Sequence, residues 1–223
     1  MEAMKISYSW EGGSMMTNGK LITFEGIDGC GKSTQVQMLS DHLSSLGYSV
    51  VVVREPGGTD VGEAIRDILL SVELSPCPET ELLLYLASRA QLTRQIIFPA
   101  LNEGKVVIAD RFADSSTVYQ GYARGIGMET VKKLNAFATM DLVPNITFIL
   151  DIPEEIAAER MKLKSKDRLE KEGTDFLKKA REGYLILARE EPERFVVVNA
   201  SRSPDVIFEE ILLILKEKRV IQF

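Results

Sequence analysis

Five short apolar runs, rich in β-branched residues, alternate with helical patterns along this chain. This alternation is typical of a parallel sheet covered by helices. Four of the five runs are almost continuously apolar, as expected for strands that are buried on both faces. We therefore predict five parallel strands, at residues 21–25, 49–53, 106–109, 146–150 and 195–198.

Helical patterns occupy most of the stretches between these runs. In the segment 32–46, the apolar residues Val36, Leu39 and Leu43 recur every three or four positions, and Gly47 is placed to end the helix. The longest helix is predicted at 79–101, and the others at 128–139, 153–164, 174–190 and 204–218. Residues 1–19 have no clear period and could be an ordered element, a disordered extension or a remnant of cloning. We predict one domain over residues 20–223.

The charge and the few cysteine and histidine residues exclude several functions. The 223 residues include 27 Lys and Arg against 33 Asp and Glu, a net charge of −6 that disfavours binding to polymeric nucleic acid. No apolar run is long enough for a membrane span. Cys30 and Cys77 lack the spacing of a zinc site or a disulfide framework, which fits a reducing cytoplasm. With His42 alone, nucleophilic catalysis assisted by an imidazole is disfavoured.

One glycine-rich segment carries a specific chemistry. Residues 26–33 match the pattern G-x-x-x-x-G-K-[ST] in full and lie between the first predicted strand and the first predicted helix. In this setting, backbone N–H groups and a helix N-terminus bind a triphosphate, while Lys32 reaches its β and γ phosphates and Ser33 binds Mg²⁺. A turn that merely joins strand to helix is the alternative. The predicted ATP-binding residues are Gly26, Ile27, Asp28, Gly29, Cys30, Gly31, Lys32, Ser33 and Thr34.

The ends of the predicted strands indicate a second ligand. The chain has neither the Asn-Lys-x-Asp segment of GTPases nor the Ser-Gly-Gly signature of transporter ATPases, which leaves small kinases with an acceptor substrate. In open parallel sheets, ligands bind beyond the carboxyl ends of the strands. Arg54 and Arg111 follow two of these ends and suit a second phosphate group, because a guanidinium binds phosphate through two parallel hydrogen bonds. A surface ion pair is the alternative for each arginine.

From about residue 20 onward, the chain resembles thymidylate kinases. The resemblance rests on segments 24–35, 54–59 (Arg-Glu-Pro-Gly-Gly-Thr), 85–89, 110–112 and 167–170 (Asp-Arg-Leu-Glu), and on Ser115, Ser116, Tyr119 and Gln120. It implies the three-layer P-loop fold of nucleoside monophosphate kinases, an α/β fold with a five-stranded parallel sheet, helices on both faces and a small lid. It also implies transfer of the γ-phosphoryl group of ATP to dTMP with Mg²⁺, and a homodimer.

The resemblance also assigns roles to residues of the acceptor site. Tyr85 and Arg89 share one helical face, and the family implies that Tyr85 stacks on thymine while Arg89 hydrogen-bonds the base. From the residues alone, a packed aromatic beside a solvated arginine is the favoured interpretation, and the resemblance reverses it. The substrate-binding residues implied by the resemblance are Asp28, Arg54, Arg66, Tyr85, Arg89, Arg111, Ser115, Ser116, Tyr119 and Gln120.

Within that set, three arginines are implied to hold the acceptor phosphate: Arg111, Arg54 and Arg66. Glu63 and Asp67 also offer Arg66 ordinary surface partners. The remaining roles concern the sugar and the metal: Asp28 is implied to meet the sugar hydroxyl, Tyr119 to disfavour ribonucleotides, and Asp110 to orient Mg²⁺ alongside Ser33.

Five cations lie within nine residues of this acidic chain: Arg160, Lys162, Lys164, Lys166 and Arg168. Such a run is commonly a solvated helix face. The resemblance instead implies a lid over residues 160–172 that brings cations to the phosphates. Some members carry an arginine in the P-loop where this chain has Gly29, so here the catalytic cations implied are Arg160 and Arg168, together with Lys32 and Arg111.

The chain departs from the usual thymidylate kinase sequence at two positions, and two alternative functions are also considered. Phe112 replaces the more usual tyrosine after Asp-Arg, and Ser116 replaces a larger base-reading residue of some members. The alternatives are a kinase of another pyrimidine nucleoside monophosphate, and a P-loop ATPase switch that needs no acceptor.

Overall fold

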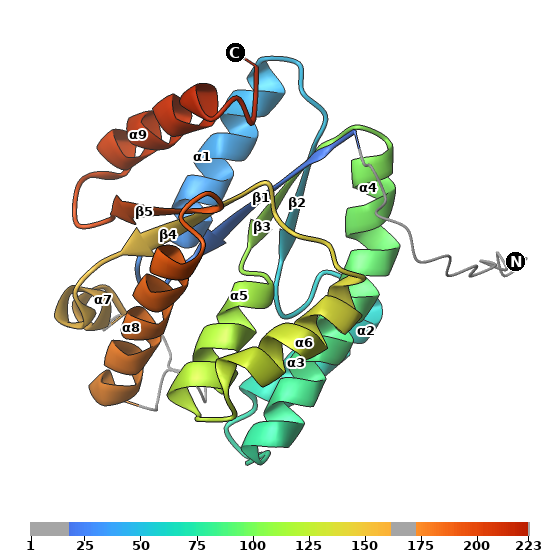
Figure 1. Cartoon of the computed structure of the whole chain (residues 1–223), viewed down its shortest axis with the longest axis vertical. Coiled ribbons are helices and arrows are strands. Elements are labelled where there is room, and N and C mark those ends of the chain that lie inside the picture. Colours follow the sequence, from blue (N-terminus) through green and yellow to red (C-terminus); the bar gives the residue numbers. More distant parts are fainter. Residues whose placement is uncertain (1–17, 162–172, 223) are drawn as a thin grey trace, which may run out of the picture.

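The computed structural model describes residues 18–161 and 173–222. In this part of the chain, five parallel strands form one sheet in the order β2-β3-β1-β4-β5 (Figure 1). All five predicted strands are confirmed, and four of them run one residue further than predicted, to end on a polar or charged residue. The strands are β1 (Lys20–Glu25), β2 (Val50–Arg54), β3 (Val106–Asp110), β4 (Ile146–Asp151) and β5 (Phe195–Asn199).

The predicted helices are present, with bounds close to those expected. Residues 79–101 were predicted as one helix and form a continuous helical stretch, α3 (Pro78–Leu92), η1 (Thr93–Ile97) and α4 (Phe98–Asn102), whose central segment is a π-helix. Pro99 follows that segment; proline has no N–H for a helical hydrogen bond, which favours a local change of helix type. The other predicted helices are α1 (Lys32–Ser45), α6 (Met128–Thr139), α7 (Glu154–Met161), α8 (Thr174–Glu190) and α9 (Pro204–Glu217).

Two helical stretches were not predicted. The first, α2 (Asp60–Leu70), begins after Thr59, whose hydroxyl accepts a hydrogen bond from the Gly62 N–H at 2.9 Å, as an N-cap does. The second comprises α5 (Ala113–Ser116) and the π-helix η2 (Thr117–Ala123), which are too short and irregular to give a clear period. The expected helical set was therefore incomplete, and both additions contain residues that were predicted to bind the acceptor, Arg66 in α2 and Ser115, Ser116, Tyr119 and Gln120 in α5 and η2.

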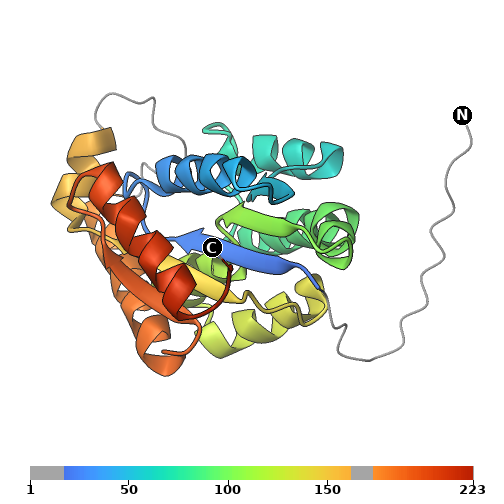
Figure 2. The same cartoon turned by 90° about the horizontal axis from the view of Figure 1, so that it is seen from above.

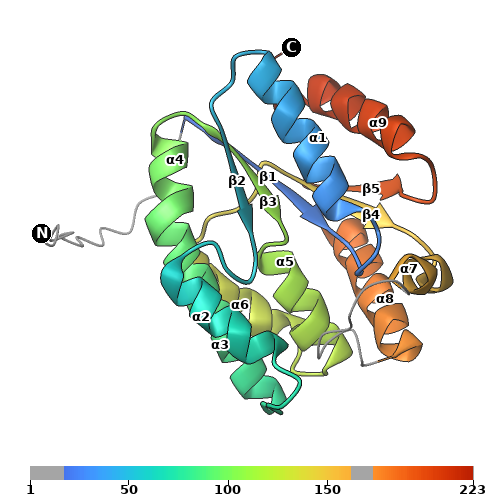
Figure 3. The same ribbon diagram turned by 180° about the vertical axis from the view of Figure 1, so that it is seen from behind.

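Helices cover both faces of the sheet (Figure 2). On one face α1 and α9 lie side by side (Figure 3), and Ile22 and Phe24 of β1 share a core cluster with Leu39 of α1. On the opposite face Leu21 of β1 packs in a cluster with Leu101 of α4. Successive residues of a strand point to opposite faces, so this three-layer arrangement requires the continuous apolar runs seen in the sequence.

The connections of the sheet determine where a ligand can bind. The chain leaves β1 for β2 and β3 on one side, and then crosses to β4 and β5 on the other. A crevice opens beyond the carboxyl ends of the strands at such a reversal of strand order. Within the described residues, no helix is both long and apolar enough to cross a membrane.

Candidate active site

The glycine-rich loop joins β1 to α1, as the motif predicted. Its first glycine, Gly26, has φ 134°, and a Cβ atom there would lie 2.7 Å from the backbone oxygen of Leu150 in β4. Its last glycine, Gly31, caps α1 with φ 100°. Both positions therefore require glycine, which brings the loop backbone close to the sheet and opens the helix N-terminus toward the crevice.

Lys32 lies inside this loop, with only 7% of its surface exposed. Its ammonium group donates hydrogen bonds to the carbonyl oxygens of Gly26 at 3.1 Å and Ile27 at 3.0 Å. The Asp28 carboxylate is 4.0 Å from the same nitrogen. These contacts hold a positive charge at the centre of the loop, where it can meet phosphate oxygens.

A cavity of about 720 Å³ lies at the carboxyl edge of the sheet and extends from the loop toward α3. It brings together residues from distant parts of the sequence. The predicted site residues that line it are Asp28, Gly29, Cys30, Gly31, Lys32, Ser33, Thr34, Arg54, Arg66, Tyr85, Asp110, Arg111, Ser115, Ser116, Tyr119, Gln120 and Arg160.

Ser33 and Asp110 meet at the donor end of the cavity. The Ser33 hydroxyl donates to the Asp110 carboxylate at 2.6 Å, across a sequence separation of 77 residues. Two hard oxygen ligands at this point suit Mg²⁺, which takes one or two protein oxygens and completes its shell with phosphate oxygens and water. Among the described residues there is no group of three or more His, Cys, Asp and Glu side chains that could hold a metal ion.

Arg111 lies between the glycine-rich loop and the acceptor region. Its backbone has φ 71°, a region that non-glycine residues rarely adopt. Its guanidinium donates to Asp28 at 2.5 Å and to Ser115 at 3.1 Å, and its carbon lies 5.2 Å from the centre of the Tyr119 ring. Burial alone would lower the pKa of Arg111, but the Asp28 carboxylate helps to raise it well above its usual value, so Arg111 stays charged.

A buried carboxylate at the end of β1 positions this arginine. Glu25 accepts hydrogen bonds from the Phe112 N–H at 2.7 Å, the Ser115 hydroxyl at 2.6 Å and the Tyr184 hydroxyl at 2.8 Å. Burial and the charge of Asp114 raise the pKa of the Glu25 carboxyl from 4.5 to about 7. Glu25 was not among the predicted site residues, although it ends an apolar strand in the same way as Asp110.

Arg54 and Arg66 lie at the other end of the cavity. The Glu63 carboxylate accepts a hydrogen bond from Arg54 at 2.9 Å and also interacts electrostatically with Arg66. A hydrogen bond from the Gly58 N–H and the charges of both arginines lower the pKa of Glu63. Arg66 donates a hydrogen bond to the backbone oxygen of Pro56 at 2.8 Å. Both arginines still line the cavity.

Tyr85 and Arg89, the two α3 residues predicted to bind the base, lie in different surroundings. Tyr85 lines the cavity, whereas Arg89 is 1% exposed and lies behind it. The five N–H groups of Arg89 donate to Glu55, Phe112, Ser116 and Asn135. Arg89 is thus neither a solvated surface arginine nor, in this arrangement, a direct donor to a ligand, and it reaches the cavity through Ser116.

Arg160 connects α7 to the glycine-rich loop. It donates to the backbone oxygens of Gly29 at 3.4 Å and Ala200 at 3.2 Å. A Cβ atom on Gly29 would lie 2.7 Å from the Ala157 oxygen of α7, so glycine allows this close approach. The other predicted lid cations, Lys162, Lys164, Lys166 and Arg168, lie outside the described residues.

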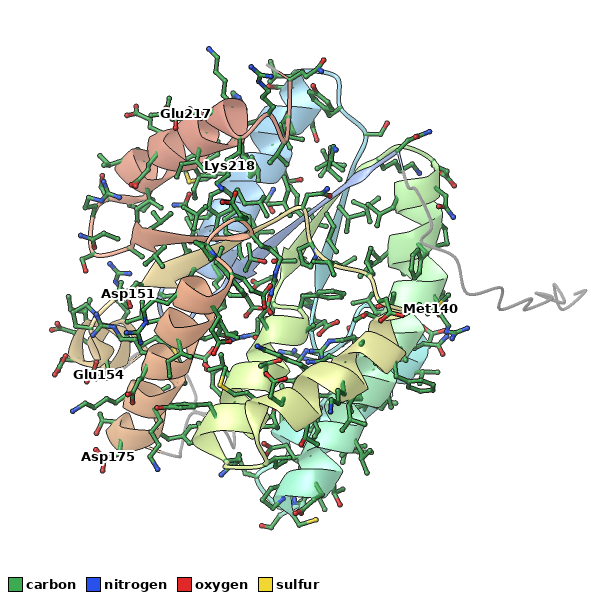
Figure 4. All side chains as sticks on the ribbon, in the orientation of Figure 1. Met140, Asp151, Glu154, Asp175, Glu217 and Lys218 are labelled. Carbon is green, nitrogen blue, oxygen red and sulfur yellow. The ribbon has the colours of Figure 1, made fainter. Side chains whose placement is uncertain are left out.

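Ion pairs connect the helices α7 and α8, which precede and follow residues 162–172 in the sequence. Asp151 and Glu154 lie next to α8 in Figure 4, and Arg181 of α8 donates to Asp151 at 2.6 Å and to Glu154 at 3.4 Å. The end of β4, the start of α7 and the middle of α8 are therefore held together by charge.

Several cavity residues were missed. Arg202, Pro204 and Ile207 line the cavity beyond the end of β5, and Gln35, Glu55, Pro56, Leu70 and Met161 complete this set. Arg54 and Arg111 were identified because they follow the ends of the second and third strands; the residues that follow the fifth strand include Arg202, which could have been found in the same way. Gly26 and Ile27 were predicted to bind ATP; they belong to the glycine-rich loop but are not among the residues that line the cavity.

Comparisons with known proteins agree with this site. The family model for thymidylate kinase matches residues 24–211. The chain is 51% identical over 199 residues to a thymidylate kinase of Thermoanaerobacter sp. (strain X514), covering 89% of this chain and 98% of the relative. It is 53% identical over 196 residues to a thymidylate kinase of Thermosipho africanus, covering 88% and 97%.

The fold is also similar to that of a solved structure. A crystal structure of thymidylate kinase from Ehrlichia chaffeensis is similar to this chain with a TM-score of 0.75 and 33% sequence identity, over 88% of this chain and 98% of that one.

Proposed function

Because this chain belongs to the thymidylate kinase family and transfers the γ-phosphoryl group of ATP to dTMP, giving dTDP and ADP, we propose how its residues divide this work. The single observation that carries the assignment of residues is the cavity, which joins the glycine-rich loop to Arg111 and Tyr85. The kinase of another pyrimidine nucleotide and the ATPase switch are not favoured.

On the donor side, the loop N–H groups bind the β and γ phosphates of ATP. Lys32 exchanges its bonds to Gly26 and Ile27 for bonds to these phosphates. Ser33 and Asp110 would hold Mg²⁺, which when bound would neutralise charge on the phosphate oxygens. The adenine binds beside Arg202, Pro204 and Ile207, which extend the cavity from the loop toward α9.

On the acceptor side, Arg111 holds the phosphate of dTMP, and Arg54 and Arg66 assist from the far wall. A phosphate dianion is itself the nucleophile, so neither a general base nor a covalent intermediate is required. The role of the arginine is to align that phosphate with the γ phosphate and to neutralise the charge between them. Arg111 suits this task because it stays charged while largely buried.

The base and the sugar bind farther from the loop. Tyr85 stacks on thymine, while Ser116 and Gln120 face its polar edge, and Arg89 supports Ser116 from behind. The Tyr119 hydroxyl is buried and makes no hydrogen bond to any residue that the structure describes. Beside the sugar, this ring leaves no space for a 2′-hydroxyl, and Asp28 accepts from the 3′-hydroxyl.

Arg160 supplies a cation at the phosphates, together with Arg168. Its contact with Gly29 supports this role, because it already reaches the loop that binds the triphosphate. A positive charge there stabilises the transition state, in which negative charge spreads over the transferring oxygens.

We also propose that the enzyme is a cytoplasmic homodimer. Large apolar side chains are exposed on the adjacent helices α2, α3 and α6, and Phe137 of α6 is 82% exposed. Exposed apolar surface of this kind marks an interface. The other residues of this face, which we call the α2-α3-α6 face, are Val61, Ile68, Leu83 and Leu134.

One assay tests the reaction. The purified protein is incubated with MgATP, without an acceptor or with dTMP, dUMP, UMP or CMP, and ADP formation is measured. We expect turnover that depends on dTMP. Turnover without any acceptor would favour the switch, and dependence on UMP or CMP would favour the other nucleotide kinase.

A further inference from the structure

Two charged side chains are buried on one face of α3, one turn on either side of Tyr85. Glu81 and Arg89 are each 1% exposed. Residues four apart on a helix share a face, so the order along this face is a carboxylate, an aromatic ring and a guanidinium. Charged residues are rarely buried so completely unless they are paired.

The partners of both charges include side chains that line the cavity. Arg89 donates to the Ser116 hydroxyl oxygen at 2.9 Å. The Gln120 amide nitrogen donates to the Glu81 carboxylate at 2.8 Å. Arg124 also donates to Glu81, at 3.3 and 3.4 Å. Ser116 and Gln120 are four residues apart and face the same stretch of α3 as Tyr85.

The charges fix which way these two polar groups point. A carboxylate only accepts hydrogen bonds, so Gln120 must turn its NH₂ group to Glu81, and its amide oxygen remains as an acceptor for the cavity. A guanidinium only donates, so Arg89 occupies one lone pair of the Ser116 oxygen and leaves the hydroxyl hydrogen able to donate to the cavity. The cavity wall beside Tyr85 thus presents, in this order, a hydroxyl that can donate and an amide oxygen, that of Gln120, which Glu81 fixes as an acceptor.

This order matches one class of pyrimidine. Thymine and uracil present an acceptor at O4 and a donor at N3–H, whereas cytosine presents a donor at its amino group and an acceptor at N3. We propose that Glu81, acting through Gln120, is a positioning residue that selects pyrimidines with an N3–H group and rejects cytosine. The inference rests on the proposed function, which puts the base of dTMP beside Tyr85.

The first test is Glu81→Gln. A glutamine at 81 can either accept or donate, so the Gln120 amide is free to turn over. We expect kcat/KM for dTMP relative to dCMP to fall at least about tenfold, because a buried polar group that faces the wrong partner is costly. The value for dUMP should fall in parallel with that for dTMP, since the two bases share this edge, while the KM for ATP stays unchanged.

The matched control is Glu79→Gln, which removes the same charge from an exposed position on the same helix. It should leave the dTMP to dCMP ratio at the wild-type value. An equal fall in both variants would mean that the net charge of α3 sets the ratio, and would overturn the inference.

If Glu81→Gln does not fold, a second variant, Gln120→Met, tests the same inference. Gln120→Met keeps the ion pair between Glu81 and Arg124 and removes the amide, so it should lower the same ratio by itself. In the double variant, Glu81→Gln should add nothing to the effect of Gln120→Met on the ratio. Additive effects, or an unchanged ratio in Gln120→Met, would overturn the inference. A wild-type protein without dTMP-dependent turnover would instead count against the proposed function.

Discussion

The Glu25 carboxylate accepts a hydrogen bond from the backbone N–H of Phe112 at 2.7 Å and so ties the end of β1 to the segment that follows β3. Arg111, the residue before Phe112, has its backbone in a conformation that few non-glycine residues adopt. The same carboxylate binds Ser115, which accepts from Arg111. A group outside the cavity lining therefore determines the position of the arginine proposed to hold the acceptor phosphate.

This carboxylate should make the stability of the protein depend on pH. Because the pKa of Glu25 is about 7 in the folded protein and 4.5 in the unfolded chain, the folded state binds more protons between these values. The free energy of unfolding therefore falls as pH rises from 4.5 to 7, by roughly 3 kcal/mol for this group. Glu25→Gln, which is neutral throughout, should remove this part of the dependence.

The measurement is urea denaturation at several pH values in this range. The slope of the unfolding free energy against pH should be less negative in Glu25→Gln than in the wild type. Glu129→Gln, on the exposed side of α6, serves as the control and should keep the wild-type slope. Parallel curves for the wild type and Glu25→Gln would show that Glu25 has an ordinary pKa.

Replacing Lys32 should reduce catalysis without affecting the fold. Its ammonium group donates to loop carbonyl oxygens rather than to the core, so Lys32→Ala should unfold close to the wild-type temperature. We expect kcat to fall at least about a hundredfold, because charge stabilisation in the transition state is lost. Steady-state turnover at saturating ATP and dTMP checks this, and near wild-type turnover would reject the assignment of the loop.

Replacing Arg111 should affect one substrate more than the other. Arg111→Ala should raise the KM for dTMP more than the KM for ATP, because the guanidinium is proposed to hold the phosphate of dTMP. Arg111→Lys is the matched comparison, since it keeps the charge but loses the planar fork, and it should retain part of the affinity for dTMP. An effect confined to the KM for ATP would contradict the proposed role.

The α2-α3-α6 face should hold two copies of the chain together. A charge at its most exposed apolar position, Phe137→Glu, should give a monomer in sedimentation velocity experiments while circular dichroism stays unchanged. Leu213→Glu, on α9 and 55% exposed, is the control and should remain dimeric. A wild-type protein that sediments as a monomer would refute the homodimer.

The sequence predicted the sheet and most helices because their signals are local. Continuous apolar runs identify strands buried on both faces, and Val36, Leu39 and Leu43 repeat with the period of a helix. α5 and η2 were missed because they are too short and irregular to give a clear period, and the π-helical form of η1 inside the helix predicted at 79–101 was not foreseen. Thr59, in contrast, is an N-cap signal for α2 that the sequence did contain.

Residues of the site could be predicted where a motif or a strand end marks them. The glycine-rich loop, Asp110 and Arg111 are of this kind, and the cavity contains most of them. Which partner each charge takes could not be predicted: Glu63 forms its hydrogen-bonded ion pair with Arg54, and Arg89 is buried. Such pairings depend on side-chain directions in three dimensions, and spacing along a helix gives only the candidates.

One buried ion pair away from the cavity should be important for stability. Arg194, just before β5, donates to both carboxylate oxygens of Asp114 in α5, at 2.6 and 3.0 Å, and its side chain is 14% exposed. Arg194→Met would leave Asp114 without this partner in a largely buried position, which costs about 3 kcal/mol in comparable cases. Chemical denaturation measures the loss, and Arg189→Met on the exposed surface of α8 should change stability by much less.

A second replacement separates the lost ion pair from lost packing. If the cost comes from the unpaired carboxylate, adding Asp114→Asn to Arg194→Met should recover part of the stability, because the amide carries no charge. Asp114 also raises the pKa of Glu25, so the double variant should have a shallower pH dependence of stability than Arg194→Met alone. A double variant that is less stable than Arg194→Met at every pH would show that Arg194 acts through packing on Phe195, whose ring centre is 3.9 Å from its guanidinium carbon.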